Sequence, residues 1–151
     1  MNAARLRIPV LWLCTGLFLL RVLGQLEVVL IGFSWLPPME HWYSGLLPYP
    51  LLLPAQIVIL MLMTGLVVQQ MLRPRATDAN WLTATALIYF AVMILRLIIQ
   101  YARGAESFLA AGGIPIVFHW ILALFLLVLS KAPHSSARAV DRPYHVIERI
   151  Q

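Results

Sequence analysis

Charged residues are scarce in this chain, and acidic residues almost disappear from its apolar stretches. Only 11% of the 151 residues are charged and 62% are hydrophobic, whereas a soluble domain carries about 25% charged residues. A soluble fold of this size cannot hide so much apolar surface, so much of that surface must face lipid. The formal net charge of +5 does not indicate nucleic acid, because the basic residues flank apolar stretches and form no patch interleaved with aromatics.

Signatures of catalysis and metal binding are also missing. The single cysteine, Cys14, cannot form an internal disulfide or a structural zinc site. The sequence contains no His-x-x-x-His, no cysteine pair, no Glu-x-x-His and no glycine-rich phosphate loop. Ser44 and Ser107 lack an evident base and acid. Haem is not expected, because two histidines on facing helices are missing. We therefore expect no metal site, and the sequence does not favour an enzyme.

Four long apolar segments are present instead. They cover residues 8–34, 49–72, 81–101 and 113–130. A bilayer core needs roughly 20 apolar residues to be crossed as a helix, and lipid offers the backbone no hydrogen-bond partner, so each segment must be helical. The sequence predicts an all-α integral membrane protein with four transmembrane helices in one domain, residues 1–131, followed by a polar cytoplasmic tail, residues 132–151.

The flanking basic residues predict the orientation. They concentrate in the N-terminal segment, the loop between the second and third segments, and the tail, at Arg5, Arg7, Arg73, Arg75, Lys131, Arg138, Arg142 and Arg149. The other two loops contribute only Arg103. We expect both termini in the cytoplasm, and we place the protein in the inner (plasma) membrane of a bacterium.

A short pattern occurs twice. Leu20-Arg21-Val22-Leu23-Gly24-Gln25 in the first segment and Leu95-Arg96-Leu97-Ile98-Ile99-Gln100 in the third both read Leu-Arg, three small or apolar residues, then Gln. The pattern predicts two helical hairpins in parallel orientation, a kind of repeat whose interface often holds a binding site. Coincidence is the alternative, because in leucine-rich helices only Arg and Gln carry information.

Polar side chains gather in one half of the predicted bundle. Counted by the helical rise of about 1.5 Å per residue, the outer half contains Arg21, Gln25, Glu27, Gln56, Arg96, Gln100 and His119. An ionisable group in the bilayer costs about 2.5–3.5 kcal/mol on insertion scales and usually marks function. Glu27 is the only acidic residue in a span and can neutralise only one of the two arginines, although its position on the helix favours Arg96. These seven residues are the predicted ligand-binding set.

Each of these residues also has a structural interpretation. Arg96 lies near enough to the surface to snorkel, Arg21 can hold the bundle together through Glu27 or the glutamines, and His119 can be an interhelical donor.

We expect the protein to function as an accessory or ligand-binding subunit of a membrane complex, with a pocket for an anionic or quinone-like amphiphile. The alternative is a stand-alone quinone-linked oxidoreductase or a small transporter. The expected partners are lipids and either other membrane subunits or a second copy, since Gly16, Gly24 and Gly32 are spaced eight apart.

Overall fold

The computed structural model describes residues 3–32, 37, 42, 49–73 and 80–131. This part of the chain is helical, with α1 over Ala3–Leu30, α2 over Tyr49–Leu72, α3 over Asn80–Ala102 and α4 over Gly113–Ser130. All four helices are long and apolar enough to cross a membrane. Four helices and an all-α class are thus confirmed, and the predicted tail over residues 132–151 lies outside the described residues.

The helix limits agree with the sequence prediction within one residue except in α1. The prediction for α2 and α4 is correct to the residue, and α3 is one residue longer at each end than predicted. α1 ends at Leu30 rather than at residue 34, and Gly32 follows with a positive φ of 70°. Glycine takes this left-handed conformation without the steric cost that other residues pay, so the apolar run continues while the helix does not. α1 also begins earlier than predicted, at Ala3.

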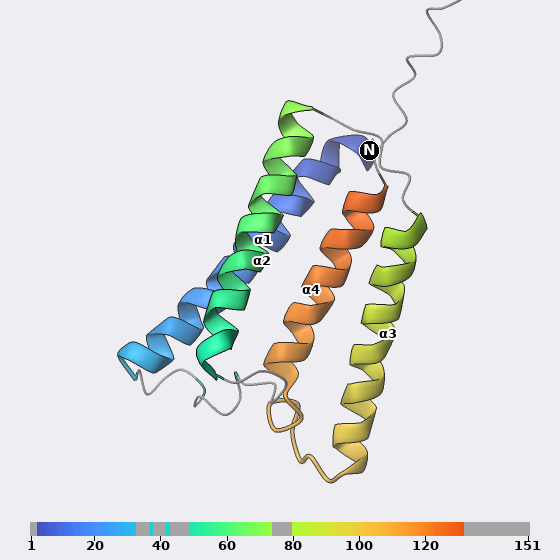
Figure 1. Cartoon of the computed structure of the whole chain (residues 1–151). Coiled ribbons are helices and arrows are strands. Elements are labelled where there is room, and N and C mark those ends of the chain that lie inside the picture. Colours follow the sequence, from blue (N-terminus) through green and yellow to red (C-terminus); the bar gives the residue numbers. More distant parts are fainter. Residues whose placement is uncertain (1–2, 33–36, 38–41, 43–48, 74–79, 132–151) are drawn as a thin grey trace, which may run out of the picture.

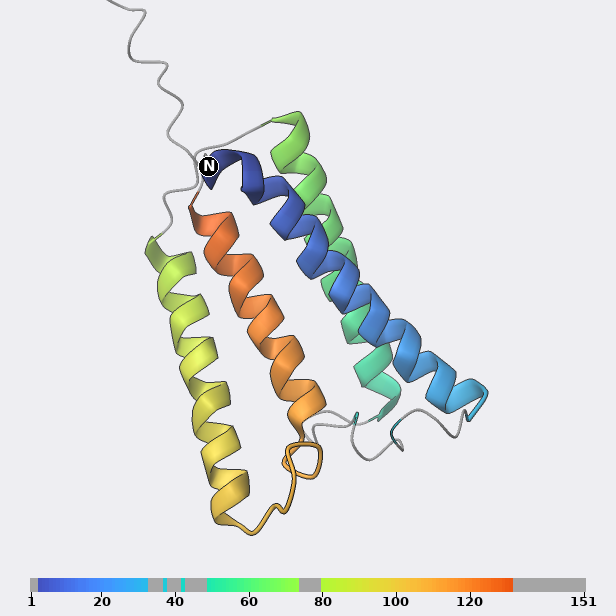
Figure 2. The same ribbon diagram turned by 180° about the vertical axis from the view of Figure 1, so that it is seen from behind.

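The helices pack in the order α2, α1, α4, α3. α1 contacts α2 and α4, and α4 contacts α3, whereas within the described residues α2 makes no close backbone contact with α3. Figures 1 and 2 show from opposite sides that α4 lies beside α3, and that α1 crosses α2 so that the far end of α1 reaches the edge of the bundle. In α1 and in α4, 39% of the apolar spanning stretch is buried inside the bundle, whereas the buried share is only 22% in α2 and 17% in α3. The outer helices therefore present apolar side chains to their surroundings, as lipid contact requires.

The two copies of the Leu-Arg pattern lie in unequal positions. A two-fold relation between the hairpins would pair α2 with α3 just as α1 pairs with α4, and the described residues contain no such contact. Arg21 is buried on the central helix α1, whereas Arg96 is half-buried on the outer helix α3. Similar sequence therefore does not give the two arginines the same surroundings.

Heptad spacing defines the buried face of α1. Arg7, Cys14 and Arg21 are seven residues apart, and so are Leu11, Phe18 and Gln25; all six are buried. Alternating steps of three and four residues keep one face of a helix against its neighbours. The apolar core is built from Leu11, Cys14, Phe18, Val22, Met63, Val67, Phe125 and Leu129. It lies in the half of the bundle where α1 begins and α4 ends, here called the terminal end; the other end is called the opposite end.

Candidate functional site

A buried amide pair joins α1 to α2 in the half nearer the opposite end. Gln56 donates through Nε2 to Oε1 of Gln25 over 2.9 Å, and the two side chains are 2% and 1% exposed. Both lie about 8–10 Å inside their helix ends by helical rise. The Nε2 of Gln25 and the Oε1 of Gln56 have no partner among the described residues. The pair therefore retains one free donor and one free acceptor in an apolar layer.

Arg21 lies one helical turn from Gln25, on the same face of α1. Its side chain is only 6% exposed, and its Cζ lies 5.2 Å from the ring centroid of Phe118 on α4. A desolvated cation over an aromatic ring gains about 2 kcal/mol. The Nε of Arg21 has no hydrogen-bond partner among the described residues, and the side chain that acts on it electrostatically is Tyr89 of α3. The guanidinium thus keeps donor capacity in a buried place.

His119 is half-buried on α4 and packs against α3. Its Nδ1 is bonded to the carbonyl of Pro115, one turn earlier in α4. A carbonyl only accepts, so this contact assigns the hydrogen to Nδ1, and in the neutral ring Nε2 then carries a lone pair. The imidazole is 5.4 Å from the Tyr89 ring, centroid to centroid, and lies within electrostatic range of both Arg21 and Arg96. His119 therefore offers an acceptor beside two cations.

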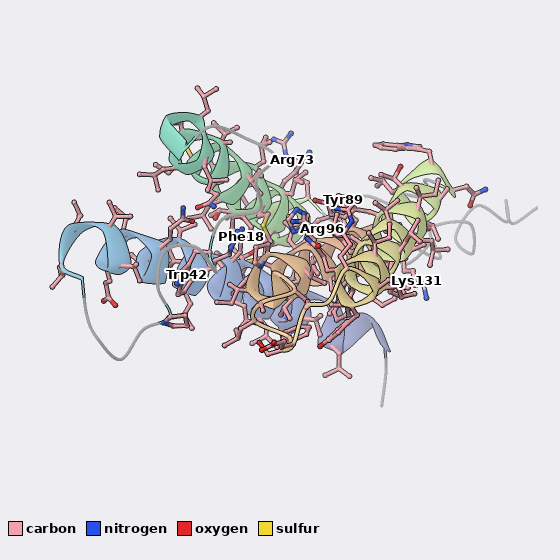
Figure 3. The ribbon with its side chains drawn as sticks, turned by 90° about the horizontal axis from the view of Figure 1, so that it is seen from below. Phe18, Trp42, Arg73, Tyr89, Arg96 and Lys131 are labelled. Carbon is pink, nitrogen blue, oxygen red and sulfur yellow. The ribbon has the colours of Figure 1, made fainter. Side chains whose placement is uncertain are left out.

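Arg96 approaches the start of α4. Its Nη2 is 3.9 Å from where a side chain would begin at Gly112, the N-cap residue, which has a φ of 76°. In Figure 3, which views the bundle from the opposite end, Tyr89 and Arg96 lie together on the side of α3 next to α4. A helix N-terminus carries partial positive charge, so the guanidinium adds to that charge instead of offsetting it.

The structure therefore divides the predicted set. His119 interacts electrostatically with both Arg21 and Arg96, and Gln25, which is bonded to Gln56, lies one helical turn from Arg21. Glu27 and Gln100 are half-buried. Glu27 lies on α1 and Arg96 on α3, and those two helices make no close backbone contact in the described chain.

Trp42 from the loop between α1 and α2 packs on the same region. It is 7% exposed, and its Nε1 donates to the carbonyl of Pro37 over 2.9 Å. A methyl group at Gly24 would lie 2.8 Å from the Cη2 atom of Trp42. The indole of Trp42 thus fills the space beside Gly24, the residue that precedes Gln25. Residues 38–41 and 43–48 of this loop lie outside the described residues.

Sequence reasoning misses several residues of the site and some buried polar groups elsewhere. The sequence does not point to Tyr89 or Phe118, because an aromatic residue in an apolar helix gives no signal of its own. Arg7 was interpreted only as an orientation signal, yet it is 8% exposed and donates to the carbonyls of Val128 and Leu129. Gln70 is also buried, 7% exposed, with no partner for its Oε1 among the described residues. The heptad spacing of Arg7 with Cys14 and Arg21 is the one sequence signal that identifies Arg7.

Comparison with known proteins identifies no relative: no family model, no curated protein and no solved structure matches this chain. Within the described part of the chain, no group of three His, Cys, Asp or Glu side chains is placed to hold a metal ion.

Proposed function

We propose that this protein is a small integral membrane protein, an accessory or ligand-binding subunit, that holds the oxygen-rich head group of an amphiphile among Arg21, Gln25, Gln56 and His119. One observation carries the proposal. Arg21, Gln25 and Gln56 are each at least nine-tenths buried, and each retains a hydrogen-bonding atom with no partner among the described residues. Buried polar atoms are normally paired, and leaving one unpaired costs about 1–3 kcal/mol.

The free atoms suit a ligand with several oxygens. The Nε of Arg21 and the Nε2 of Gln25 can donate to a carbonyl, carboxylate or phosphate oxygen, and the Oε1 of Gln56 can accept from a ligand hydroxyl. A quinone is one such ligand, and in the quinone-linked alternative His119 and Glu27 would be available for proton transfer. The depth of the site favours a ligand with an apolar tail, because that tail can remain among the apolar helices.

The proposed orientation places this site in the outer half of a bacterial inner membrane, with both termini cytoplasmic. The supporting observation is the distribution of basic residues, since Arg73 and Lys131 are exposed at the terminal end and Lys and Arg gather on the cytoplasmic side of membrane proteins. The arrangement as two hairpins running from inside to outside and back belongs to the same proposal.

Native mass spectrometry on protein extracted gently in its own lipids tests the proposal. A small molecule should co-purify with the wild type and be lost from the Gln25→Leu, Gln56→Leu double variant. Gln69→Leu is the matched control, because Gln69 lies on α2 but is exposed, and it should keep the ligand. A ligand-free wild type within a larger assembly would contradict the binding site and assign the polar groups to assembly with another subunit.

A further inference from the structure

We infer that the ligand's head group is an oxyanion, a carboxylate or phosphate, bound by Arg21 with Arg96 and His119 beside it. This inference rests on the proposed function and specifies the chemistry of the ligand at that same site. It stands on the placement of charge: a guanidinium that is 6% exposed, and a histidine within range of two arginines.

No acidic side chain is found to compensate Arg21 in the described chain. Its ionisable neighbour Tyr89 is uncharged at neutral pH and supplies no negative charge. Glu27 is six residues further along α1, and at 100° per residue it therefore points about a third of a turn away from Arg21. The described residues thus give the buried guanidinium of Arg21 no acidic partner.

A buried charge without a counter-ion is costly, and within a bilayer such groups pair with a partner. The planar guanidinium matches two oxygens of a carboxylate or phosphate at once. The Nε2 of Gln25, one turn away and unpartnered among the described residues, supplies a further donor on the same face. An oxyanion satisfies these donors and the charge together, whereas a neutral carbonyl satisfies only the donors.

The start of α4 adds to this preference. The guanidinium of Arg96 lies beside Gly112, the N-cap of α4, where the backbone dipole already favours negative charge. Phe118, His119 and Pro115 all belong to the first two turns of the same helix. A negative head group near His119 would therefore interact favourably with the guanidinium groups of Arg21 and Arg96 and with the N-terminus of α4.

Three probes separate the head group from the tail: oleyl phosphate, oleyl alcohol with the same tail but no charge, and inorganic phosphate with the same charged group but no tail. Binding to the full-length protein in nanodiscs of zwitterionic lipid is measured by native mass spectrometry and by the shift of the melting temperature. We expect oleyl phosphate to bind at one per chain, oleyl alcohol about tenfold or more weaker, and inorganic phosphate not detectably, because a charge-assisted hydrogen bond is about twice as strong as a neutral one.

Variants test which group holds the charge. Arg21→Gln should weaken oleyl phosphate by about tenfold or more, and Arg21→Lys, which keeps the charge but loses the planar fork, should weaken it less. Arg103→Gln removes an exposed arginine next to α3 and should change nothing. Without ligand, Arg21→Gln should melt close to the wild type, because the cost of burying the charge is removed together with its contact to Phe118, and this measurement separates loss of the site from loss of the fold.

The contrary outcomes are distinct. If oleyl alcohol or a neutral quinone, decylubiquinone, binds as tightly as oleyl phosphate, the oxyanion is wrong while the amphiphile site stands. If inorganic phosphate binds as tightly as oleyl phosphate, the amphiphile is wrong. If no probe binds and nothing co-purifies, both proposals fail. Glu40, in the loop between α1 and α2, lies outside the described residues, so the variant Glu40→Gln is also tested. A tenfold gain in its affinity for oleyl phosphate would identify Glu40 as the resident counter-ion and overturn the inference.

Discussion

The guanidinium of Arg7, near the start of α1, donates a 3.1 Å hydrogen bond to the carbonyl oxygen of Leu129, near the end of α4. A second bond of 3.2 Å runs from its Nε to the carbonyl of Val128, and the hydroxyl of Ser130 donates to the carbonyl of Leu127. The last four carbonyls of a helix have no intrahelical donor, and a cation at that end also complements the helix dipole. The two ends of the chain's helical part are thereby joined by side chains.

Replacing Arg7 should therefore destabilise the protein. Arg7→Gln removes two bonds from a charged donor, each worth about 1.5–3 kcal/mol, and we expect the free energy of unfolding to fall by at least about 3 kcal/mol. Reversible unfolding in mixed micelles measures it. Arg73→Gln, an exposed arginine at the same end of the bundle, is the control and should change stability by less than about 0.5 kcal/mol. Equal effects for the two would leave Arg7 with no role beyond orientation.

The contact between Thr83 and Ser130 should be measurable as a coupling energy. Thr83 donates from its Oγ1 to the Oγ of Ser130 over 2.9 Å, joining the start of α3 to the end of α4. A double-mutant cycle with Thr83→Val and Ser130→Ala should give an interaction of about 0.6 kcal/mol and no more than about 1.7 kcal/mol, the range found for interhelical hydrogen bonds in membranes. Strictly additive single effects would mean that the two hydroxyls do not stabilise one another.

The sequence predicts the helices well because length and apolarity are local properties. A bilayer sets the minimum length of a span, so the limits of α2 and α4 follow from where the apolar residues begin and stop. The end of α1 could not be predicted in the same way, because Ile31 is as apolar as Leu30. There the backbone conformation of Gly32 accompanies the end of the helix, and hydropathy does not report backbone conformation.

The candidate site could be predicted only in part. Arg21, Gln25, Gln56 and His119 are evident because polar residues inside apolar runs need a reason. Their contacts with Phe118 and Tyr89 could not be predicted, because these contacts depend on which helices are neighbours. The expected repeat suggests equivalent hairpins, but the observed order places α1 and α4 at the centre, so of Arg21 and Arg96 only Arg21 is deeply buried.

Gly24 should be intolerant of a side chain. Alanine there would place its Cβ 2.8 Å from the Trp42 ring, and such overpacking typically costs about 1–3 kcal/mol. Gly16→Ala is the matched control on the same helix, because no atom of the described residues lies within 4 Å of the point where its side chain would begin and alanine favours a helix by about 0.5–1 kcal/mol. Combining Gly24→Ala with Trp42→Leu should recover part of the loss.

Thermal unfolding and tryptophan emission follow these glycine variants. Displacement of Trp42 should shift the emission in Gly24→Ala but not in Gly16→Ala. If Gly16→Ala instead weakens a dimer detected by cross-linking, the glycines on α1 contact a second copy. Unchanged stability and emission in Gly24→Ala would show that Trp42 does not pack on Gly24 in the membrane.

The amide pair should respond asymmetrically to single and double substitutions. Gln56→Leu alone leaves the amide of Gln25 wholly unpartnered and buried, at a cost of about 1–3 kcal/mol, whereas apolar residues at both positions remove the polar groups together and can be nearly neutral. The Gln25→Leu, Gln56→Leu double variant should thus be more stable than either single variant when no ligand is bound. Gln69→Leu, exposed on α2, should be close to the wild type. Unfolding in ligand-free nanodiscs provides the comparison. If the double variant loses the sum of the two single effects, the glutamines act independently and their 2.9 Å contact contributes nothing to stability. If the double variant recovers its stability but no longer retains the co-purifying molecule, the stability of the bundle is separate from its capacity to bind.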